Sequence, residues 1–349
     1  MQKILSIFIT AICSCYISNA QQKKQHVVNA IAFYNVENLF DTIRDPYTID
    51  VDFNYRYTEK IYHKKLQNLA SVFEKLAKDD QSKFSIPGGP AIIGLAEVEN
   101  KEVIEALIAQ PSLKARNYNI VHFNSPDVRG IDVALIYRPD LFKVLSAKSI
   151  NVDITKDDKK EKTRDILFVT GILDTDTVHV FVNHWPSRRG GEAASSWKRK
   201  KAADVVRAQV DSLTKLNENA KIVIMGDLND DPVSPSVVKN LGAATDKQNA
   251  IQNKSLFNPW YAFYKKGIGT LGFSDRWNLF DQIIISYGFV NPNTTNGWKY
   301  HTAEIFSRSF ITSQFGRFTG YPHRSFSGTQ WIDGYSDHFP TIIYLVKEQ

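Results

Sequence analysis

Cysteine is almost absent from this sequence of 349 residues. Its two cysteines, Cys13 and Cys15, both lie in the first twenty residues. If that segment is removed on export, the remaining chain has no cysteine. This excludes a disulfide framework and a zinc site with cysteine ligands. The domain then depends for its stability on a hydrophobic core and on any hard metal ion that it binds.

Long hydrophobic runs are also scarce. The longest lies between Lys3 and Ser18 and is shorter than the roughly 20 residues that a membrane-spanning helix needs. Ser18 and Ala20 occupy the small-residue positions of a cleavage site, so residues 1–20 predict a secretory signal peptide and an exported protein (periplasmic, outer-surface or extracellular). Two alternatives remain open: a membrane anchor, and lipid attachment at Cys15 within an imperfect lipobox.

Several familiar signatures are missing. The sequence has no Walker-type glycine loop, no GxSxG elbow and no HExxH, the usual marks of nucleotide hydrolysis, acyl transfer and zincin proteolysis. Repeats, low-complexity tracts and proline- or serine-rich linkers are absent too, which predicts a single domain over 27–349 with a long aromatic and basic insertion at about 288–335. The net charge of +6 permits an anionic partner without indicating one.

Short β-rich runs make up most of the remaining pattern. Most of them are continuously apolar, which is typical of strands buried on both faces. Two amphipathic helices are expected, one capped by Thr58 and one from Ala193 to about Asn217, whose polar side would carry Lys198–Lys201 and Arg207. The pattern predicts two stacked sheets with helices outside. The predicted strands are 27–36, 91–98, 118–123, 131–138, 166–174, 178–185, 221–228, 281–286 and 341–346.

Polar side chains recur at the ends of these predicted strands. Any one of them could simply form a turn, but so many strand ends with Asn, Glu, His and Asp are hard to explain in that way. Strand ends hold ligand groups rigidly, so these residues are candidates for a functional site. They are Asn35, Glu37, Glu97, His184, Asp227, Asn229, Asp281, Asp337 and His338.

The candidate residues offer mainly oxygen ligands. Carboxylate and amide oxygens suit a hard divalent cation such as Mg²⁺, with Mn²⁺ or Ca²⁺ as alternatives, and the histidines leave zinc as a weaker one. Magnesium sites commonly combine one or two carboxylates with substrate phosphate oxygens, and the ion stabilises charge as a phosphorus–oxygen bond breaks. The residues therefore indicate metal-assisted phosphate chemistry.

Seven motifs, in order, resemble those of the endonuclease/exonuclease/phosphatase superfamily, which has the deoxyribonuclease I-like fold. The motif sequences are most similar to those of secreted bacterial nuclease-like members. The match runs from about residue 29 to 346. The GDxN and SDH motifs in that order are specific, whereas NVEN alone is weak. The motifs are FYNVENLFD (33–41), GLAEVEN (94–100), RGIDVALIYRP (129–139), VNHWPSRRGGE (182–192), IVIMGDLNDDP (222–232), DRWNLFDQIIIS (275–286) and GYSDHFP (334–340).

The resemblance implies a four-layer α/β sandwich, with two mixed sheets packed face to face between helices, and metal-dependent cleavage of a phosphate ester. Glu97 resembles the metal-binding glutamate, with Asn35 and Asp337 in the metal and phosphate region. Asp227 resembles the residue that orients or deprotonates the attacking water, and Asn229 resembles one that positions water and phosphate.

The resemblance also implies roles for two histidines. His338 resembles the histidine that steadies the transition state, and Asp281 the carboxylate that orients its ring. His184 occupies the place of a second histidine that faces the leaving oxygen as general acid. These roles agree with elementary chemistry, because a carboxylate beside an imidazole fixes its tautomer and raises its basicity.

Other polar positions have two interpretations each. Arg188 and Arg189, which follow the predicted general acid, are expected to contact substrate phosphate, although they could form a solvated basic turn; Arg129 is a weaker candidate of the same kind. Glu37 is either a solvent-facing carboxylate or a second-metal ligand. Asp132, inside an apolar strand, is expected to be a structural hydrogen-bonding residue.

Three functions are compatible with these residues. The preferred one is a secreted nuclease that cleaves DNA or RNA, so that nucleic acid is the expected partner. The second is a phosphatase or a phospholipase C-type enzyme acting on inositol phosphates or sphingomyelin. The third is a non-catalytic binding protein. Aromatic residues interleaved with arginine in 288–335 could stack bases or could pack the insertion against the body. No obligate protein partner is indicated, and the oligomeric state is open.

Overall fold

The computed structural model describes residues 26–48, 57–156, 161–273 and 275–348. The predicted signal peptide, including Cys15, lies outside the described residues. Within them, no helix is both long enough and apolar enough to cross a membrane.

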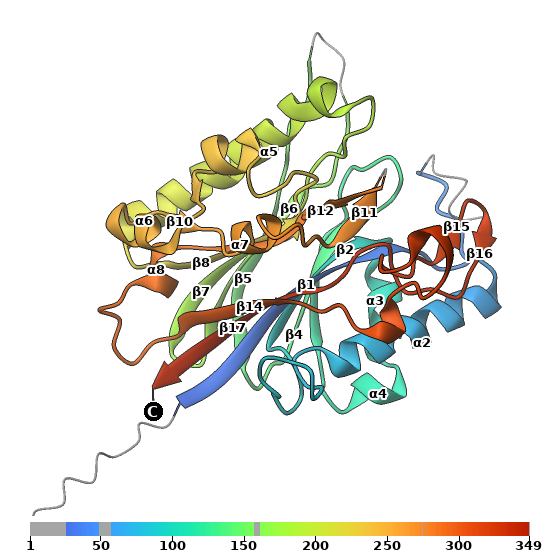
Figure 1. Ribbon diagram of the computed structural model, residues 1–349, viewed down its shortest axis with the longest axis horizontal. Coiled ribbons are helices and arrows are strands. Elements are labelled where there is room, and N and C mark those ends of the chain that lie inside the picture. The colour runs from blue at the N-terminus through green and yellow to red at the C-terminus, as the bar shows by residue number, and fades with distance from the viewer. Residues whose placement is uncertain (1–25, 49–56, 157–160, 274, 349) are drawn as a thin grey trace, which may run out of the picture.

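Two large mixed sheets form the centre of the molecule (Figure 1). The six-stranded sheet has the order β14-β17-β1-β2-β4-β3, in which only β1 and β2 run parallel. It contains the first three motif segments, and the last motif directly precedes its strand β17. Its strands are β1 (His26–Leu39), β2 (Ile92–Val98), β3 (Asn119–His122), β4 (Asp132–Tyr137), β14 (Lys299–Ile305) and β17 (Thr341–Glu348).

The seven-stranded sheet has the order β5-β6-β7-β8-β13-β10-β9. Here β7 and β8 run parallel, as do β9 and β10. Each strand predicted from the sequence is present, and the structure adds β5, β9, β10 and β14 to the two sheets. β9 and β10 have only two residues each, and β5 is largely exposed or half-buried, so their apolar signal is weak. The strands are β5 (Phe142–Ile150), β6 (Ile166–Leu173), β7 (Asp176–His184), β8 (Lys221–Asp227), β9 (Ala243–Ala244), β10 (Leu256–Phe257) and β13 (Asp281–Ile285).

The two sheets pack face to face, with β1 against β8 and β13, and β2 against β7 and β8. The sheets approach closely at Gly94 of β2, where a Cβ atom would lie 2.4 Å from Sδ of Met225 on β8. The central strands are buried on both faces, which explains their continuously apolar sequences. The predicted fold class, a sandwich of two mixed sheets between helices, is confirmed.

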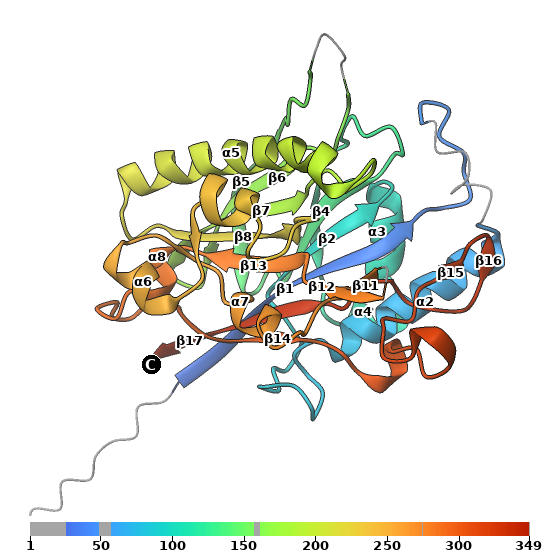
Figure 2. The same ribbon diagram turned by 45° about the horizontal axis from the view of Figure 1, so that its top comes forward.

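Helices cover the outer faces of both sheets. Figure 2 shows α5 on one side of the sandwich, and α2, α3 and α4 on the other. Thr58 caps α2, as predicted, by accepting a hydrogen bond from the Ile61 amide. Phe73 of α2 packs on Tyr34 of β1, with ring centres 5.9 Å apart. The helices are α2 (Glu59–Lys75), α3 (Lys101–Ile108), α4 (Pro111–Lys114), α5 (Glu192–Leu216), α6 (Lys247–Gln252), α7 (Tyr261–Tyr264) and α8 (Tyr287–Val290).

The polar side predicted for α5 needs one correction. Arg199 is fully buried, and its Nε lies 2.8 Å from Oδ1 of Asp230. The sequence pattern did not reveal this, because a basic run looks like a solvated face until a buried carboxylate from another segment is placed beside it. Lys201, by contrast, is exposed.

The segment 288–335 is more integrated than an appendage would be. Its strand β14 forms the edge of the six-stranded sheet beside β17. Trp298, Phe306 and Phe326 are buried, which agrees with packing against the body, whereas Phe315 and Phe318 are exposed. The short elements are β11 (Leu271–Phe273), β12 (Arg276–Asn278), β15 (Phe326–Ser327) and β16 (Gln330–Trp331), the π-helical turn η1 (Ser236–Asn240), and the 3-10 turns η2 (Ser309–Ile311) and η3 (Gly316–Phe318).

Candidate active site

The strand register brings polar residues of both sheets to one end of the sandwich. In the seven-stranded sheet, His184 pairs with Asp227 across β7 and β8, and Asp227 pairs with Asp281 across β8 and β13. From the other sheet, Asn35 Nδ2 donates a hydrogen bond of 3.1 Å to Asp227 Oδ2. The predicted strand-end residues therefore meet where the two sheets face each other.

Asp227 lies at the centre of this group. Its Oδ1 accepts a hydrogen bond of 2.9 Å from the Asn229 amide, and its Oδ2 lies 3.7 Å from Nε2 of His184 and 3.8 Å from Nε2 of His338. Burial, reinforced by the neighbouring carboxylate of Asp281, raises the pKa of Asp227 to about 6, although His338 opposes the shift. A carboxylate with a pKa in this range can accept a proton near neutral pH.

His338 and Asp281 form a buried pair. His338 Nδ1 is hydrogen-bonded to Asp281 Oδ2 at 2.7 Å, and Asp281 is completely buried. Burial alone would lower the pKa of His338, but Asp281 outweighs it, helped by Asp227 and Asp337, so the pKa of His338 is raised well above its usual value. The ring is therefore held as a cation with its Nε2 directed toward Asp227.

His184 differs in its protonation. Burial, together with the positive charges of Arg164 and Arg129, lowers the pKa of His184 well below its usual value. The ring is therefore neutral. Its Nε2 lies 3.7 Å from Glu97 Oε1, and its Nδ1 has no hydrogen-bond partner within the described part of the chain.

Glu97 is held in an unusual backbone conformation. Its φ of +64° lies in the left-handed region, as do those of Glu37, Asn38 and Asn229 close by. Such conformations each cost about 1–3 kcal/mol in non-glycine residues and cluster at functional sites. The Glu97 side chain accepts a hydrogen bond of 3.1 Å from the Asn38 amide, and its Oε1 lies 3.8 Å from Nη2 of Arg129.

Asp337 stands at the open side of the group. Its side chain is 36% exposed, with Oδ1 3.8 Å from Nε2 of His338 and Oδ2 3.3 Å from Nη2 of Arg324. Glu37, which the sequence left undecided, is buried instead of facing solvent. It accepts a hydrogen bond of 2.6 Å from the Ser325 amide, and burial with the nearby Asp337 raises its pKa to about 7.

The donor set fits a divalent cation. Asp227, Asp281 and His338 each offer a ligand atom within 4.8 Å of the others and could hold a metal ion. The Asp281–His338 hydrogen bond, however, already engages two of these three residues. The predicted set of Glu97, Asn35 and Asp337 offers oxygen donors alone, the chemistry that a hard cation requires. A cation would also relieve the carboxylate repulsion that raises the pKa of Asp227.

The predicted phosphate-binding arginines lie in three different environments. Arg188 donates to the Asn229 carbonyl at 2.9 Å and pairs with Glu192, Asp230 and Asp231, so its guanidinium braces the loop after β8. Arg189 is exposed, with no ion-pair partner among the described residues. Arg129 is partly exposed beside Glu97. Of the three, Arg129 and Arg189 are the ones available to an anionic ligand.

Several supporting residues escaped sequence reasoning. Arg164 donates to the backbone carbonyls of His184 and Trp185 at 3.2 and 2.7 Å, and pairs with Asp127 at 3.0 Å. These partners are far apart in sequence, and no spacing signals their contact. Asp132 behaves as predicted: it accepts hydrogen bonds from the amide and hydroxyl of Ser125 at 2.8 and 2.6 Å.

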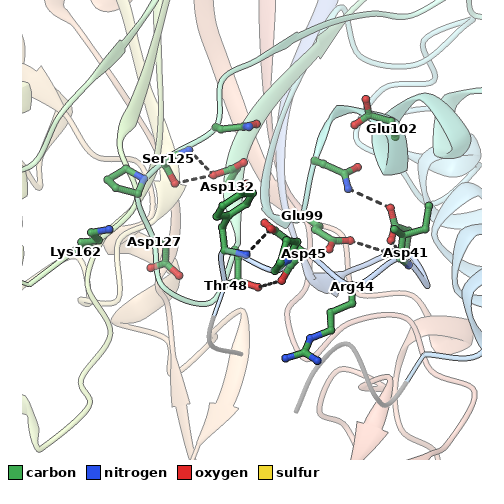
Figure 3. Close-up of a pocket in the computed structure, with 17 residues that line it drawn as sticks. Asp41, Arg44, Asp45, Thr48, Glu99, Glu102, Ser125, Asp127, Asp132 and Lys162 are labelled. Atoms are coloured by element: carbon green, nitrogen blue, oxygen red, sulfur yellow. Dashed lines mark hydrogen bonds between the residues drawn. The ribbon is translucent and has the colours of Figure 1, made fainter. Parts of the chain in front are cut away.

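A wide acidic cleft of about 630 Å³ lies beside the strand-end group (Figure 3). Asp41, Asp45, Glu99 and Asp132 line it. Glu99 accepts a hydrogen bond of 2.7 Å from the Asp41 amide, and its pKa is raised to about 8, chiefly by burial and further by the surrounding carboxylates. The carboxylates that line this cleft disfavour the binding of a bare anion there.

The family model for the endonuclease/exonuclease/phosphatase family matches residues 30–347. The chain belongs to this family. It is therefore a metal-dependent phosphoesterase, a hydrolase, as the motifs predicted. No curated protein sequence matches the chain.

Solved structures share the fold at low identity. TDP2 of D. rerio complexed with single-strand DNA product is 15% identical, with a TM-score of 0.55, and the match covers 91% of this chain and 98% of that one. A mannosyl-6-phosphatase of Bacteroides thetaiotaomicron is 15% identical, with a TM-score of 0.54, over 91% and 99%. The human Nocturnin catalytic domain is 13% identical, with a TM-score of 0.52, over 93% and 98%. These similarities establish the fold but do not identify the substrate.

Proposed function

We propose that the protein is an exported nuclease that cleaves phosphodiester bonds of DNA or RNA by metal-assisted attack of water. The observation that carries the proposal is the convergence of two buried histidines on one oxygen of Asp227. The His338 ring is cationic and the His184 ring is neutral. The site therefore holds one group suited to the charge that develops on the phosphate and another suited to the leaving oxygen. Residues 1–20 support export.

Asp227 is positioned to orient the attacking water and accept its proton. The Asn229 amide and the Asn35 side chain hold the Asp227 carboxylate from two directions, at 2.9 and 3.1 Å. This fixed orientation favours attack because the water and the phosphate meet in one geometry. His338, held cationic by Asp281, faces the negative charge that develops on the phosphoryl oxygens.

His184 is assigned to the leaving oxygen. Its ring is neutral in the free protein, and an anionic phosphate bound beside it would raise its pKa toward the range of a general acid. Glu97, Asn35 and Asp337 would hold Mg²⁺, with Mn²⁺ or Ca²⁺ as alternatives. The ion would supply Lewis-acid stabilisation of the phosphoryl oxygens.

A substrate panel with metal add-back tests the proposal. Purified protein freed of metal is incubated with plasmid, linear and single-stranded DNA and with RNA, with and without each cation. Metal-dependent cleavage that Asp227→Ala abolishes is the expected result. Absence of cleavage with every cation would contradict the nuclease assignment.

A second candidate is a phosphatase or phospholipase C-type enzyme, which one feature favours. The hairpin of β11 and β12 exposes Phe273 (71%), and Phe318 nearby in the insertion is also exposed (52%). An ion pair of 2.7 Å between Asp275 and Arg317 places charge in the same region, which opposes insertion into a membrane. Release of phosphate or phosphocholine from inositol phosphates or sphingomyelin vesicles, without nucleic-acid cleavage, would decide for this alternative. A metal titration that shows no binding, together with inactivity on every phosphate ester tested, would revive the non-catalytic alternative.

A further inference from the structure

A second, smaller cleft of about 190 Å³ adjoins the acidic one and has the opposite character. The two clefts share Asp127 and Lys162, both labelled in Figure 3. Three segments build the smaller cleft: the loop before β4, the segment before β6 and the loop between β7 and α5. Its polar lining includes Arg129, Lys162, Thr163, Arg164, Arg189 and Lys198.

Positive charge in this cleft exceeds what its carboxylates neutralise. Arg164 pairs with Asp127, and Lys198 pairs with Glu161. Lys162 and Arg189 have no ion-pair partner among the described residues, whereas Arg188, directly before Arg189, pairs with three carboxylates. A small hollow with two unpaired cations concentrates an anion.

Thr163 adds a separate sign of an unfilled site. It lines the cleft and is only 2% exposed, yet its hydroxyl has no hydrogen-bond partner within the described part of the chain. A buried hydroxyl without a partner costs about 1–3 kcal/mol, so such groups are normally satisfied by water or a ligand.

The cleft also borders the reaction centre. Arg129, which lines it, lies 3.8 Å from Glu97, and Arg164 donates to the His184 backbone carbonyl at 3.2 Å. Arg189 lies on the same loop, after His184. A ligand held here would therefore sit on the side of His184, where the leaving oxygen departs. A further hollow that shares Arg189 and Lys198 continues the path toward Trp197.

We propose that this cationic cleft binds a flanking phosphodiester of the nucleic-acid strand, on the leaving-group side of the bond that is cut. The inference rests on the proposed nuclease function and adds the direction in which the strand leaves the site. Repeating phosphates along one strand match a cationic path that starts at the reaction centre, whereas a small phosphate monoester has no second phosphate to place in it.

Binding is measured without cleavage, so that its result is independent of turnover. In an Asp227→Asn background, Lys162→Gln and Arg189→Gln are titrated with a fluorescein-labelled single-stranded oligonucleotide at several salt concentrations. Lys201→Gln, an exposed α5 residue outside the cleft, is the matched control. Each cleft variant is expected to bind about tenfold more weakly, with the salt slope reduced by roughly 0.7 per lost phosphate contact. The control is expected to match the parent.

Turnover supplies the second readout. With Asp227 intact, the loss of kcat/KM for an oligonucleotide in Lys162→Gln should exceed the loss for bis(p-nitrophenyl) phosphate by about tenfold, because the small diester has no flanking phosphodiester. Equal losses, or binding and salt slopes equal to those of Lys201→Gln, would overturn the inference. Cleavage of DNA with unchanged binding in the variants overturns this inference alone. A protein that neither binds nor cleaves nucleic acid overturns the proposed function as well.

Discussion

At the strand ends, the positions that function requires for single side chains lower the stability of the fold. Asp227 is buried among carboxylates, and its raised pKa of about 6 means that the fold disfavours its charged form. Asn35 and Asn229 nevertheless orient it with hydrogen bonds. A residue that lowers the stability of the fold and is nevertheless held in a fixed orientation is typical of a functional site.

Asp227→Asn should separate these two effects. We expect kcat to fall by roughly 10²–10⁴, the usual contribution of a general base. The unfolding midpoint at pH 7 should be no lower than that of the native protein, because a buried charge is removed. Activity assays and urea denaturation check both. Asp165→Asn, which changes a carboxylate directly before β6 that accepts hydrogen bonds from Ser149 and Asn151, serves as control. A similar loss of activity in this variant would contradict the assignment.

Asp281 is expected to act through His338 as a positioning residue. In Asp281→Asn the negative partner at 2.7 Å is lost, so the pKa of His338 should fall from its raised value. An NMR titration of the imidazole measures this shift. Activity should fall by about 10–100-fold, as for other residues that orient a catalytic group. An unchanged imidazole pKa would show that Asp281 does not set the charge of the ring.

At the scale of elements, close approach of strands fixes the ends of β7 and β8. Gly226, just before Asp227, has no room for a side chain: a Cβ atom would lie 2.3 Å from the Asn183 carbonyl oxygen on β7. Gly226→Ala should therefore lower the free energy of unfolding by about 1–3 kcal/mol, because the strands must separate. Urea denaturation measures it. Gly190→Ala, where nothing lies within 4 Å but φ is +81°, measures the cost of backbone strain without a steric clash.

Ion pairs of Arg308 connect the edge strand β14 to the loop after α2. Arg308 holds Asp79 at 2.8 Å and Glu304 at 2.7 Å. Burial alone would raise the pKa of Asp79, but the hydrogen bonds from Arg308 and Ser82 prevail and lower it. A carboxyl with a lowered folded-state pKa stabilises the fold above its unfolded pKa of about 3.9, and that stabilisation is lost as the pH falls through the folded value.

Asp79→Asn should remove this acid sensitivity. The variant is expected to be less stable than the native protein at pH 7 and to approach it in stability as the pH falls from the unfolded pKa of about 3.9 through the lower folded value, where Asp79 of the native protein becomes protonated. Urea midpoints across this range provide the measurement. A constant difference between the two proteins at all pH values would mean that the ion pair does not titrate with folding.

At the scale of the whole molecule, the site exists only while both sheets are packed together. Asn35 and Glu97 come from one sheet, and Asp227 and His184 from the other. Glu97, Asn35 and Asp337, the residues assigned to the cation, come together only in the folded chain, so a bound cation should stabilise the folded protein. At 100 times its dissociation constant, a ligand contributes about 2.7 kcal/mol.

Thermal unfolding with and without Mg²⁺ tests this linkage. The midpoint should rise with metal concentration in the native protein, and EDTA should reverse the rise. Glu97→Gln should abolish most of the shift, whereas Glu102→Gln, an exposed position on α3, should retain it. Equal shifts in both variants would place the ion elsewhere.

The sequence by itself determined the sandwich and predicted the candidate site. Continuous apolar runs identified the central strands because burial on both faces leaves that pattern, and polar residues at their ends made Asn35, Glu97, His184, Asp227 and His338 candidates. Only the tertiary structure decided how charges pair. Arg188 and Arg199 belong to a basic run in the sequence, yet both are paired with Asp230. Lys162 and Arg189 are unpaired among the described residues. Ion pairs form between loops that are far apart in sequence, and no sequence periodicity marks their contact. No local pattern could therefore distinguish an arginine that holds a loop in place from one that is free to bind a ligand.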